Sequence, residues 1–331
     1  MMVCERCGMP DTRPGSIFTD GVCQACHNMD NREAIDWLRR DADLRGICQN
    51  AISMKNTYDC ICPVSGGKDS TTIVAGLTDL GMRPLLVTVT DEFTHTQAGS
   101  HNVKNIAERF NLDHLIFRHE PQTFKGMTKA DFYDEMHPLK WIEEKIYNTP
   151  TMVAKALGIP YVFFGENSAY EYGTSDVLEY RHPLSDEKVS VYYYFAFRPY
   201  DEHGSRDTAR MYGFKDLDDF GEWPRQGQVE QFTQIDSVAY IIQLWTKFPK
   251  YGFQRVSDIT SRMVRKGQMT KEVADQLVRD RDWICDPAAK RDFCNTIGIT
   301  EREFNDAVDI HANRDILIKD SAGNWRRKDL L

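Results

Sequence analysis

The sequence lacks long hydrophobic runs and any pattern typical of a secretory signal. No apolar run of about 18 residues or more occurs in the 331-residue chain, so we expect no membrane span. The first residues, Met1 to Arg6, lack a basic stretch followed by an apolar one, which predicts a cytoplasmic protein. Internal repeats and low-complexity tracts are also missing, and a charged fraction of 27% is typical of a globular chain.

An excess of basic residues is lacking as well. The chain has 41 Lys and Arg against 50 Asp and Glu, a net charge of −9. This argues against a nucleic-acid-binding protein that works by charge alone, although it does not exclude a local basic groove. Residues 229–331 also lack the dense basic and aromatic interleaving expected of an RNA clamp.

Short apolar runs alternate with helical patterns in the first half of the chain. The expected strands are 59–64, 84–90, 112–118 and 161–165, and the expected helices between them are 70–80, 101–111 and 139–157. This alternation predicts an α/β fold with a parallel, doubly wound sheet, in which ligands bind at the carboxyl ends of the strands.

The second half of the chain is predicted to be mostly helical. Helices are expected over 229–248, 256–265 and 271–281, while the glycine-rich stretch 185–228 is expected to form irregular loops that face a substrate. The predicted organisation is a metal module over 1–30, a connecting helix over 31–57, an α/β domain over 58–180, and a mostly helical substrate or partner region over 181–331.

Four of the nine cysteines form two Cys-x₂-Cys pairs near the N-terminus, Cys4 with Cys7 and Cys23 with Cys26. Each pair places two thiolates on one turn, and two such turns give a tetrahedral four-sulfur site that suits Zn²⁺. Four protein ligands leave no open position, so we expect a structural zinc knuckle. The alternatives are disulfides or free thiols, and replacement of one ligand by His27 is disfavoured.

The most informative motif is Val64-Ser65-Gly66-Gly67-Lys68-Asp69-Ser70, between a predicted strand and a predicted helix. Two glycines and a helix N-terminus suit a bound phosphate. The motif is not a Walker A loop, because Cys62 lies five positions before Gly67 and Asp69 follows Lys68. An acidic residue in a phosphate loop is explained by a cation, so we expect Asp69 to hold Mg²⁺. A glycine-rich turn without a ligand is the alternative.

This motif resembles the loop of the PP-loop, or N-type, ATP pyrophosphatases, which have an adenine nucleotide alpha hydrolase-like fold. The resemblance implies that ATP is cleaved between its α- and β-phosphates. It also implies that the loop residues bind pyrophosphate and Mg²⁺, with Lys68 supplying charge; these are Ser65, Gly66, Gly67, Lys68, Asp69 and Ser70. The end of the second strand, Thr90 and Asp91, would lie near the adenosine, although Asp91 and Glu92 are equally typical of a solvated turn.

Four features together resemble the N-acetyl sugar amidotransferase family of bacterial surface-glycan biosynthesis. They are the four-cysteine knuckle, residues 63–70, the stretch 165–173, and the stretch 247–253 with Ser261, Arg262 and Gly267 after it. The resemblance implies that the acetamido oxygen of an N-acetyl sugar attacks ATP and that ammonia then displaces AMP to give an acetamidino group. It further implies a glutaminase and an ammonia-channel protein as partners.

Further site residues are suggested by this resemblance. Glu166 and Asn167 are expected near the acceptor amide or ammonia, and Glu171 and Tyr172 are expected to bind the sugar or close the site, with core packing as the alternative for Tyr172. The basic residues of the last third are expected to bind a sugar-nucleotide diphosphate or a sugar carboxylate, with a solvated helix face as the alternative; they are Lys247, Lys250, Arg255, Arg262 and Arg265.

Two other functions are weighed against this interpretation. Cys60 and Cys62 lie on one face of the strand before the phosphate loop, and with Cys285 and Cys294 they suggest a PP-loop sulfurtransferase that thiolates a nucleobase or tRNA. Burial of these cysteines in the core is the simpler explanation. A non-catalytic, ATP-binding zinc adaptor is the second alternative. The sequence leaves open which sugar is the acceptor, whether it is linked to a nucleotide, and whether the chain is a homo-oligomer.

Overall fold

A parallel five-stranded sheet lies at the centre of the α/β part of the chain. The computed structural model describes residues 1–165 and 172–331. The strands are β3 (Cys60–Pro63), β4 (Pro84–Thr90), β5 (His114–Arg118), β6 (Tyr161–Phe164) and β7 (Ser190–Tyr193), and their order is β5-β4-β3-β6-β7. Every pairing between them is parallel, so the predicted parallel, doubly wound sheet is confirmed.

The strand order reverses between β3 and β6. From β3 the chain proceeds to β4 and β5 on one side and then crosses back to place β6 and β7 on the other. At such a switch point the loops after the two central strands diverge and leave a crevice at their carboxyl ends. The phosphate loop directly follows β3, so it lies at this crevice.

Helices cover both faces of the sheet. On one face lie α2 (Trp37–Ser53), α3 (Lys68–Asp79) and α4 (Gln97–Phe110), and on the other lies α6 (Lys140–Leu157). Alternation along β3 decides which side chains meet which helix: Cys60 and Cys62 pack with α2 and α3, whereas Ile61 packs with α6.

A second core joins helices from the middle and the end of the chain. It forms where α5 (Pro121–Glu135) and α6 meet α10 (Ile241–Trp245), α14 (Pro287–Ile297) and α15 (Glu301–His311). The other helices are α8 (Glu202–Met211), α9 (Leu217–Phe220), α11 (Lys247–Tyr251), α12 (Arg255–Arg265) and α13 (Lys271–Arg281), and a hairpin of β8 (Leu317–Lys319) and β9 (Trp325–Arg327) follows. The prediction of a mostly helical C-terminal region is therefore confirmed.

Two predictions for the second half were wrong. The single helix expected over 229–248 is irregular up to Ser237, because its backbone pairs with the loop before α4: the Thr96 amide donates to the Asp236 carbonyl, and the Val238 amide donates to the Thr94 carbonyl. The stretch 185–228, expected to be irregular, contains β7, α8 and α9. Gly204 lies inside α8, Gly213 separates α8 from α9, and Gly221 and Gly227 follow α9, while the strand β7 has a buried Val191.

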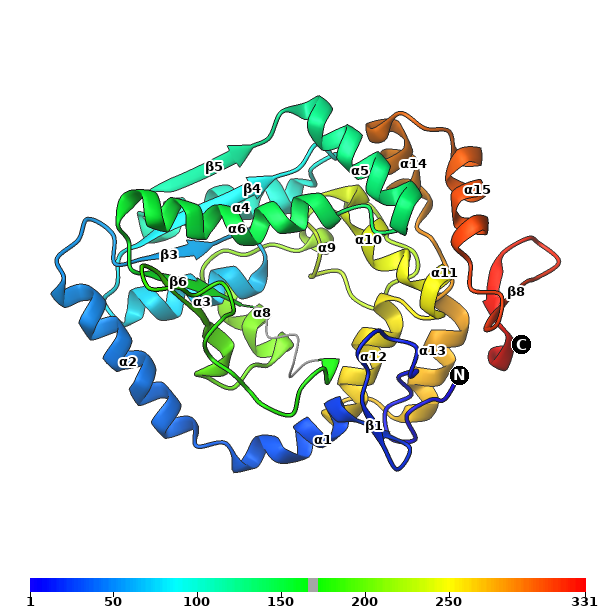
Figure 1. Cartoon of the computed structure of the whole chain (residues 1–331), viewed down its shortest axis with the longest axis horizontal. Coiled ribbons are helices and arrows are strands. Elements are labelled where there is room, and N and C mark those ends of the chain that lie inside the picture. Colours follow the sequence, from blue (N-terminus) through cyan, green and yellow to red (C-terminus); the bar gives the residue numbers. More distant parts are fainter. Residues whose placement is uncertain (166–171) are drawn as a thin grey trace.

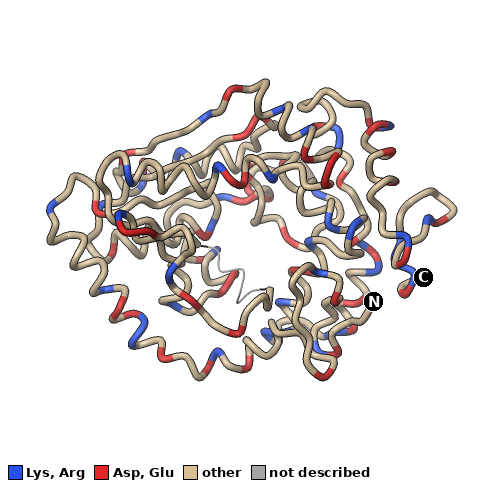
Figure 2. Tube along the Cα trace, viewed as in Figure 1, with Lys and Arg blue, Asp and Glu red and all other residues tan. Residues whose placement is uncertain are grey.

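The N-terminal cysteine module lies beside the C-terminal helices. It comprises the hairpin of β1 (Phe18–Thr19) and β2 (Val22–Cys23) and the helix α1 (Gln24–Asn31). Figure 1 shows this module next to α12 and α13, with α2 running from it back to the sheet. Acidic and basic residues are interspersed along the trace in Figure 2. Among the described residues no helix is both long and apolar enough to cross a bilayer.

Candidate active site

The phosphate loop is a tight turn that only glycine can form at its centre. Gly66 has a φ of +79°, and a Cβ atom added there would lie 2.8 Å from the backbone nitrogen of Val103 on α4. Gly67 is the N-cap of α3 and, within the described chain, offers no side-chain cap to the helix. The first N–H groups of α3 are thus oriented to bind an anion, as the sequence predicts.

Lys68 and Asp69 form the charged centre of this loop. The Lys68 side chain is only 3% exposed, and its Nζ lies 2.7 Å from Asp69 Oδ2 and 3.1 Å from the Tyr200 hydroxyl oxygen. Asp69 Oδ1 is buried and has no hydrogen-bond partner among the described residues. A carboxylate oxygen without a partner, at the mouth of a phosphate-binding turn, suits Mg²⁺ bound to a polyphosphate.

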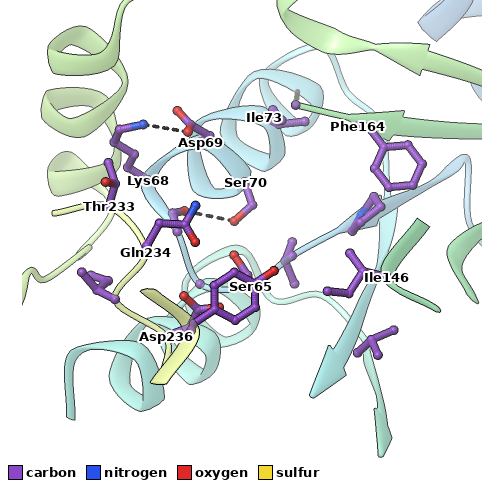
Figure 3. A pocket seen from close by; sticks show the side chains of 18 of the residues that line it. Ser65, Lys68, Asp69, Ser70, Ile73, Ile146, Phe164, Thr233, Gln234 and Asp236 are labelled. Carbon is purple, nitrogen blue, oxygen red and sulfur yellow. Dashed lines mark hydrogen bonds and ion pairs between the residues drawn. The ribbon is translucent and has the colours of Figure 1, made fainter. Parts of the chain in front are cut away.

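A cavity of about 280 Å³ opens from the loop across the carboxyl ends of β3, β4 and β6. One half has apolar walls from β4, α6 and β6, namely Val87, Val89, Ile142, Ile146, Tyr147, Pro150 and Phe164. The other half is polar and includes Thr233, Gln234 and Asp236, which Figure 3 shows on a segment facing the phosphate loop. An apolar half suits a planar base, and a polar half suits a sugar or another hydroxylated acceptor.

Two carboxylates, Asp91 and Asp236, lie at the junction of this cavity with a neighbouring groove of about 530 Å³. Asp91 Oδ2 accepts a hydrogen bond of 2.9 Å from the Ser237 hydroxyl group, which fixes it beside the segment that carries Asp236. Burial raises the pKa of Asp91. Burial and the charge of Asp91 raise the pKa of Asp236 to about 6. Both carboxyl groups are therefore better proton acceptors than ordinary aspartates.

At the polar end of the cavity, arginines from α12 surround a buried glutamate. Arg262 Nη1 donates to Glu202 Oε1 over 2.9 Å, and Arg255 Nη2 lies 3.9 Å from the same oxygen. Burial opposes ionisation of Glu202, but the charges of Arg262 and Arg255 outweigh it and lower its pKa to about 2. Arg255 Nε is buried without a hydrogen-bond partner in the described part of the chain. This end of the cavity is therefore prepared for an anionic or strongly polar group.

The structure brings only part of the predicted site together. Asp91, Tyr172, Arg255 and Arg262 line the cavity with the phosphate loop. Thr90 instead lines the neighbouring groove, where its hydroxyl oxygen lies 3.4 Å from His95 Nε2. Glu166, Asn167 and Glu171 lie outside the described residues.

Three of the predicted basic residues do not line the cavity. Lys247 is ion-paired with the buried Asp258 at 2.5 Å, and Lys250 donates to the Glu135 carbonyl. Arg265 Nη1 lies 3.5 Å from Cys7 Sγ in the cysteine module. Lys247 and Lys250 lie on α11, whereas Arg255 and Arg262 project from α12 toward the cavity and Arg265, its last residue, projects toward the module.

Several cavity residues were not predicted individually. Tyr200 and Glu202 fall in the stretch expected to form substrate-facing loops, and Gln234 and Asp236 fall in the stretch expected to be helical. A signal for Asp236 was the acidic residue inside the apolar run from Phe232 to Ile242, which is unusual for a buried helix face.

The four N-terminal cysteines form a cluster of metal-binding geometry. The Sγ atoms of Cys4, Cys7, Cys23 and Cys26 all lie within 4.8 Å of one another and are buried. Cys4 and Cys26 are separated by 3.8 Å and Cys7 and Cys23 by 3.6 Å between their Sγ atoms. Tetrahedral Zn–S bonds require Sγ separations of about 3.8 Å. Gly8 and Gly21, beside the two cysteine pairs, have φ values of +78° and +79°, a backbone conformation that glycine adopts readily.

Zinc removal is expected to unfold this knuckle. A segment with so little core would depend on a bound metal, so we expect about one zinc per chain by elemental analysis and loss of that zinc in Cys23→Ser. Cys285→Ser is the matched control, because Cys285 lies outside the cluster. A chain that retained the knuckle's structure after stringent chelation, with no bound metal, would contradict the assignment.

The cysteines beneath the phosphate loop are packed in the core. Cys60 and Cys62 are fully buried, and burial raises the pKa of Cys60. Burial also raises the pKa of Cys285, and that of Cys294 to about 11. Cys60, Cys62 and Cys294 are thus packed in the core, and Cys285 is partly buried beside the helical core.

Residues 226–330 match a family model described as "LPS biosynthesis protein WbpG-like, C-terminal domain". This match agrees with the resemblance of the sequence to a family of bacterial surface-glycan biosynthesis. The matched region contributes the cavity wall from Phe232 to Asp236 together with Arg255 and Arg262. No curated protein matches the chain.

A comparison with solved structures finds two synthetases among the matches to this chain. An NMN synthetase from Francisella tularensis has a TM-score of 0.40 and 9% identity, with 80% of this chain and 94% of that chain covered. An NAD+ synthetase from Burkholderia pseudomallei has a TM-score of 0.36 and 12% identity, with 78% of this chain and 98% of that chain covered.

Proposed function

We propose that this chain is an ATP-dependent amidotransferase that converts the acetamido group of an N-acetyl sugar into an acetamidino group. ATP would be consumed as AMP and pyrophosphate, and the nitrogen would come from ammonia. The observation that carries the proposal is the phosphate loop with Asp69 at the strand switch point, opening into a cavity whose far wall belongs to the region that matches lipopolysaccharide biosynthesis proteins.

The proposed chemistry has two steps. In the first, the acetamido oxygen attacks the α-phosphorus of ATP, and the bond from that phosphorus to the bridging oxygen breaks to release pyrophosphate. In the second, ammonia adds to the activated carbon, and the C–O bond breaks to release AMP. An amide carbon is a poor electrophile, so adenylation is needed to turn its oxygen into a leaving group. The amide oxygen ends in AMP.

The residues of the phosphate loop would bind and neutralise the departing pyrophosphate. The backbone N–H groups at the start of α3 face the phosphates, and Lys68 supplies a buried positive charge. Asp69 would hold Mg²⁺, which would supply positive charge for the leaving group when bound. Catalysis in this half of the cavity is thus positioning and charge neutralisation.

We assign proton transfer to the pair of Asp91 and Asp236. Ammonium must lose a proton before its nitrogen can attack, and a carboxylate with a pKa near 6 accepts that proton more readily than an ordinary aspartate. The pair lies at the edge of the cavity next to Ser65, between the phosphate loop and the neighbouring groove. The resemblance to the amidotransferase family is what suggests that a glutaminase with an ammonia-channel protein would supply the ammonia.

Product analysis tests the proposal directly. The chain is incubated with ATP, Mg²⁺, ammonium and a panel of N-acetylated sugars, both nucleotide-linked and free nine-carbon acids, and the sugars are examined by mass spectrometry. A mass decrease of about 1 Da marks replacement of oxygen by NH. Formation of ADP and orthophosphate would contradict the proposal. Release of pyrophosphate that depends on tRNA and a sulfur donor would support a sulfurtransferase, and ATP binding without turnover would support an adaptor.

An isotope experiment separates adenylation from other uses of ATP. With ¹⁸O in the acetamido group, the label is expected in AMP, because the amide oxygen stays on the α-phosphorus. Label in pyrophosphate or in water would contradict the proposed first step. The unlabelled sugar is the control.

A further inference from the structure

In the loop between the two cysteine pairs, the Arg13 side chain reaches the wall of the cavity. Its guanidinium carbon lies 4.4 Å from the centre of the Tyr172 ring and 4.7 Å from that of Phe253. Arg13 is also ion-paired with Asp258 of α12, and the two side chains are 14% and 1% exposed. A guanidinium held between two rings and a buried carboxylate is fixed in position.

The rest of the zinc knuckle contacts the same wall. A Cβ atom at Gly173 would lie 2.4 Å from the Ala25 nitrogen, so the chain after Tyr172 packs directly on α1. Asn28 Nδ2 donates to the Ser175 carbonyl over 2.8 Å. Phe253, just before α12, is part of the knuckle's own hydrophobic core. The knuckle is therefore built into the two segments that carry Tyr172 and α12.

These two segments present their other side to the cavity. Tyr172 and Arg262 both line it, and the guanidinium carbon of Arg262 lies 4.9 Å from the centre of the Tyr172 ring. Arg262 in turn donates to Glu202 at the polar end of the cavity. Arg13 of the knuckle thus contacts Tyr172, Tyr172 contacts Arg262, and Arg262 contacts Glu202 at the charged end of the cavity.

We propose that Arg13 is a positioning residue through which the zinc-bound knuckle fixes Tyr172 and Arg262 at the acceptor end of the cavity. The statement that this end holds the acceptor rests on the proposed function. Arg13 lies in a loop of fifteen residues between the two cysteine pairs. Cys4, Cys7, Cys23 and Cys26 would hold zinc and so join both ends of this loop, which would lower the entropy lost when Arg13 is placed against Tyr172. The phosphate loop has no such contact with the knuckle among the described residues.

Kinetics of Arg13→Ala and Arg13→Lys test this role. For the acetamido sugar that the wild type converts, we expect Arg13→Ala to raise KM about tenfold, the size of effect expected from loss of a buried cation–π contact. We expect kcat and the KM for ATP to stay within about twofold, since no contact joins Arg13 to the phosphate loop. Lysine keeps the charge opposite Asp258 but loses the planar stack, so partial rescue is expected.

The matched control is Arg6→Ala. Arg6 belongs to the same knuckle, but its ion pair with Asp30 is exposed, at 45% and 51% for the two side chains. We expect wild-type KM values and an unchanged zinc content. An equal rise in both KM values in Arg13→Ala, or unchanged kinetics, would overturn the positioning role.

Hydrogen exchange gives a readout that does not require turnover. In Arg13→Ala, amide exchange is expected to rise in residues 172–177 and in α12, but not in α3, while Arg6→Ala leaves all three unchanged. Chelation of zinc from the wild type is expected to give the same pattern. If the wild type converts no sugar, the proposed function fails, but hydrogen exchange still tests whether Arg13 couples the knuckle to residues 172–177 and α12. Wild-type exchange in residues 172–177 and α12 of Arg13→Ala would refute the coupling.

Discussion

Replacement of Asp69 by asparagine is expected to abolish turnover while the chain stays folded. Asparagine keeps the shape of the side chain but removes the negative charge that would bind Mg²⁺ beside the departing pyrophosphate. Pyrophosphate release should fall by roughly 10³-fold or more, the size of effect expected when charge stabilisation in the transition state is lost. The measurement is the initial rate of pyrophosphate release at saturating ATP and Mg²⁺.

Asp79→Asn is the matched control for this variant. Asp79 is exposed at the other end of the same helix, so the same chemical change is made far from the loop. Asp69→Asn also leaves the buried Lys68 with a weaker partner, and we expect a stability loss of about 1 kcal/mol by denaturant titration. Turnover at the wild-type rate in Asp69→Asn would remove this carboxylate from its role.

The phosphate loop could be predicted because all of its information is local. A strand, two glycines and a helix start follow one another within a few residues, and each has a physical requirement that the sequence shows directly. The cysteine module was predictable for the same reason, since two short spacings determine its geometry. The parallel sheet followed from the alternation of strands and helices, but the order of its strands did not, because the long connection from β5 to β6 crosses to the other side of β3.

The polar end of the cavity could not be predicted residue by residue, because it is assembled from distant parts of the chain. Lys68 meets Tyr200 from 132 positions away, and Glu202 meets Arg262 from 60 positions away. Nothing in the local sequence distinguishes Arg262, which lines the cavity, from Lys247, which is ion-paired with the buried Asp258. The two basic residues differ only in where the packing of α12 between the knuckle and the cavity places their partners.

The error over 229–248 has a definite physical origin. Apolar residues recur there at helical spacing, but the backbone around Asp236 bonds to the loop before α4 instead of to itself. Gly99 allows that approach, because a Cβ atom there would lie 2.6 Å from the Asp236 Cα atom. The segment thereby gives up helical hydrogen bonds and places a carboxylate at the cavity wall. Such conflicts between local preference and tertiary structure are expected at functional sites.

Replacement of Asp236 by asparagine is expected to lower activity and raise stability at the same time. Removal of the proton acceptor should reduce amidine formation by roughly 10²-fold, the usual contribution of a general base. The folded-state pKa of about 6 is above the ordinary aspartate value, so the folded chain binds more protons than the unfolded chain between those pH values. Ionised Asp236 therefore costs stability above pH 6, and asparagine removes that cost.

Thermal unfolding at two pH values checks the sign of this effect. At pH 7.5 we expect the free energy of unfolding of Asp236→Asn to be about 1–2 kcal/mol higher than that of the wild type, after allowance for partial exposure of the side chain. At about pH 4, where Asp236 is protonated in the folded wild type, the difference should largely disappear. Asp207→Asn, at an exposed position on α8, should change neither activity nor stability. A destabilised Asp236→Asn with unchanged activity would show that the carboxylate is a structural group, held for its contacts, and that another residue accepts the proton from ammonium.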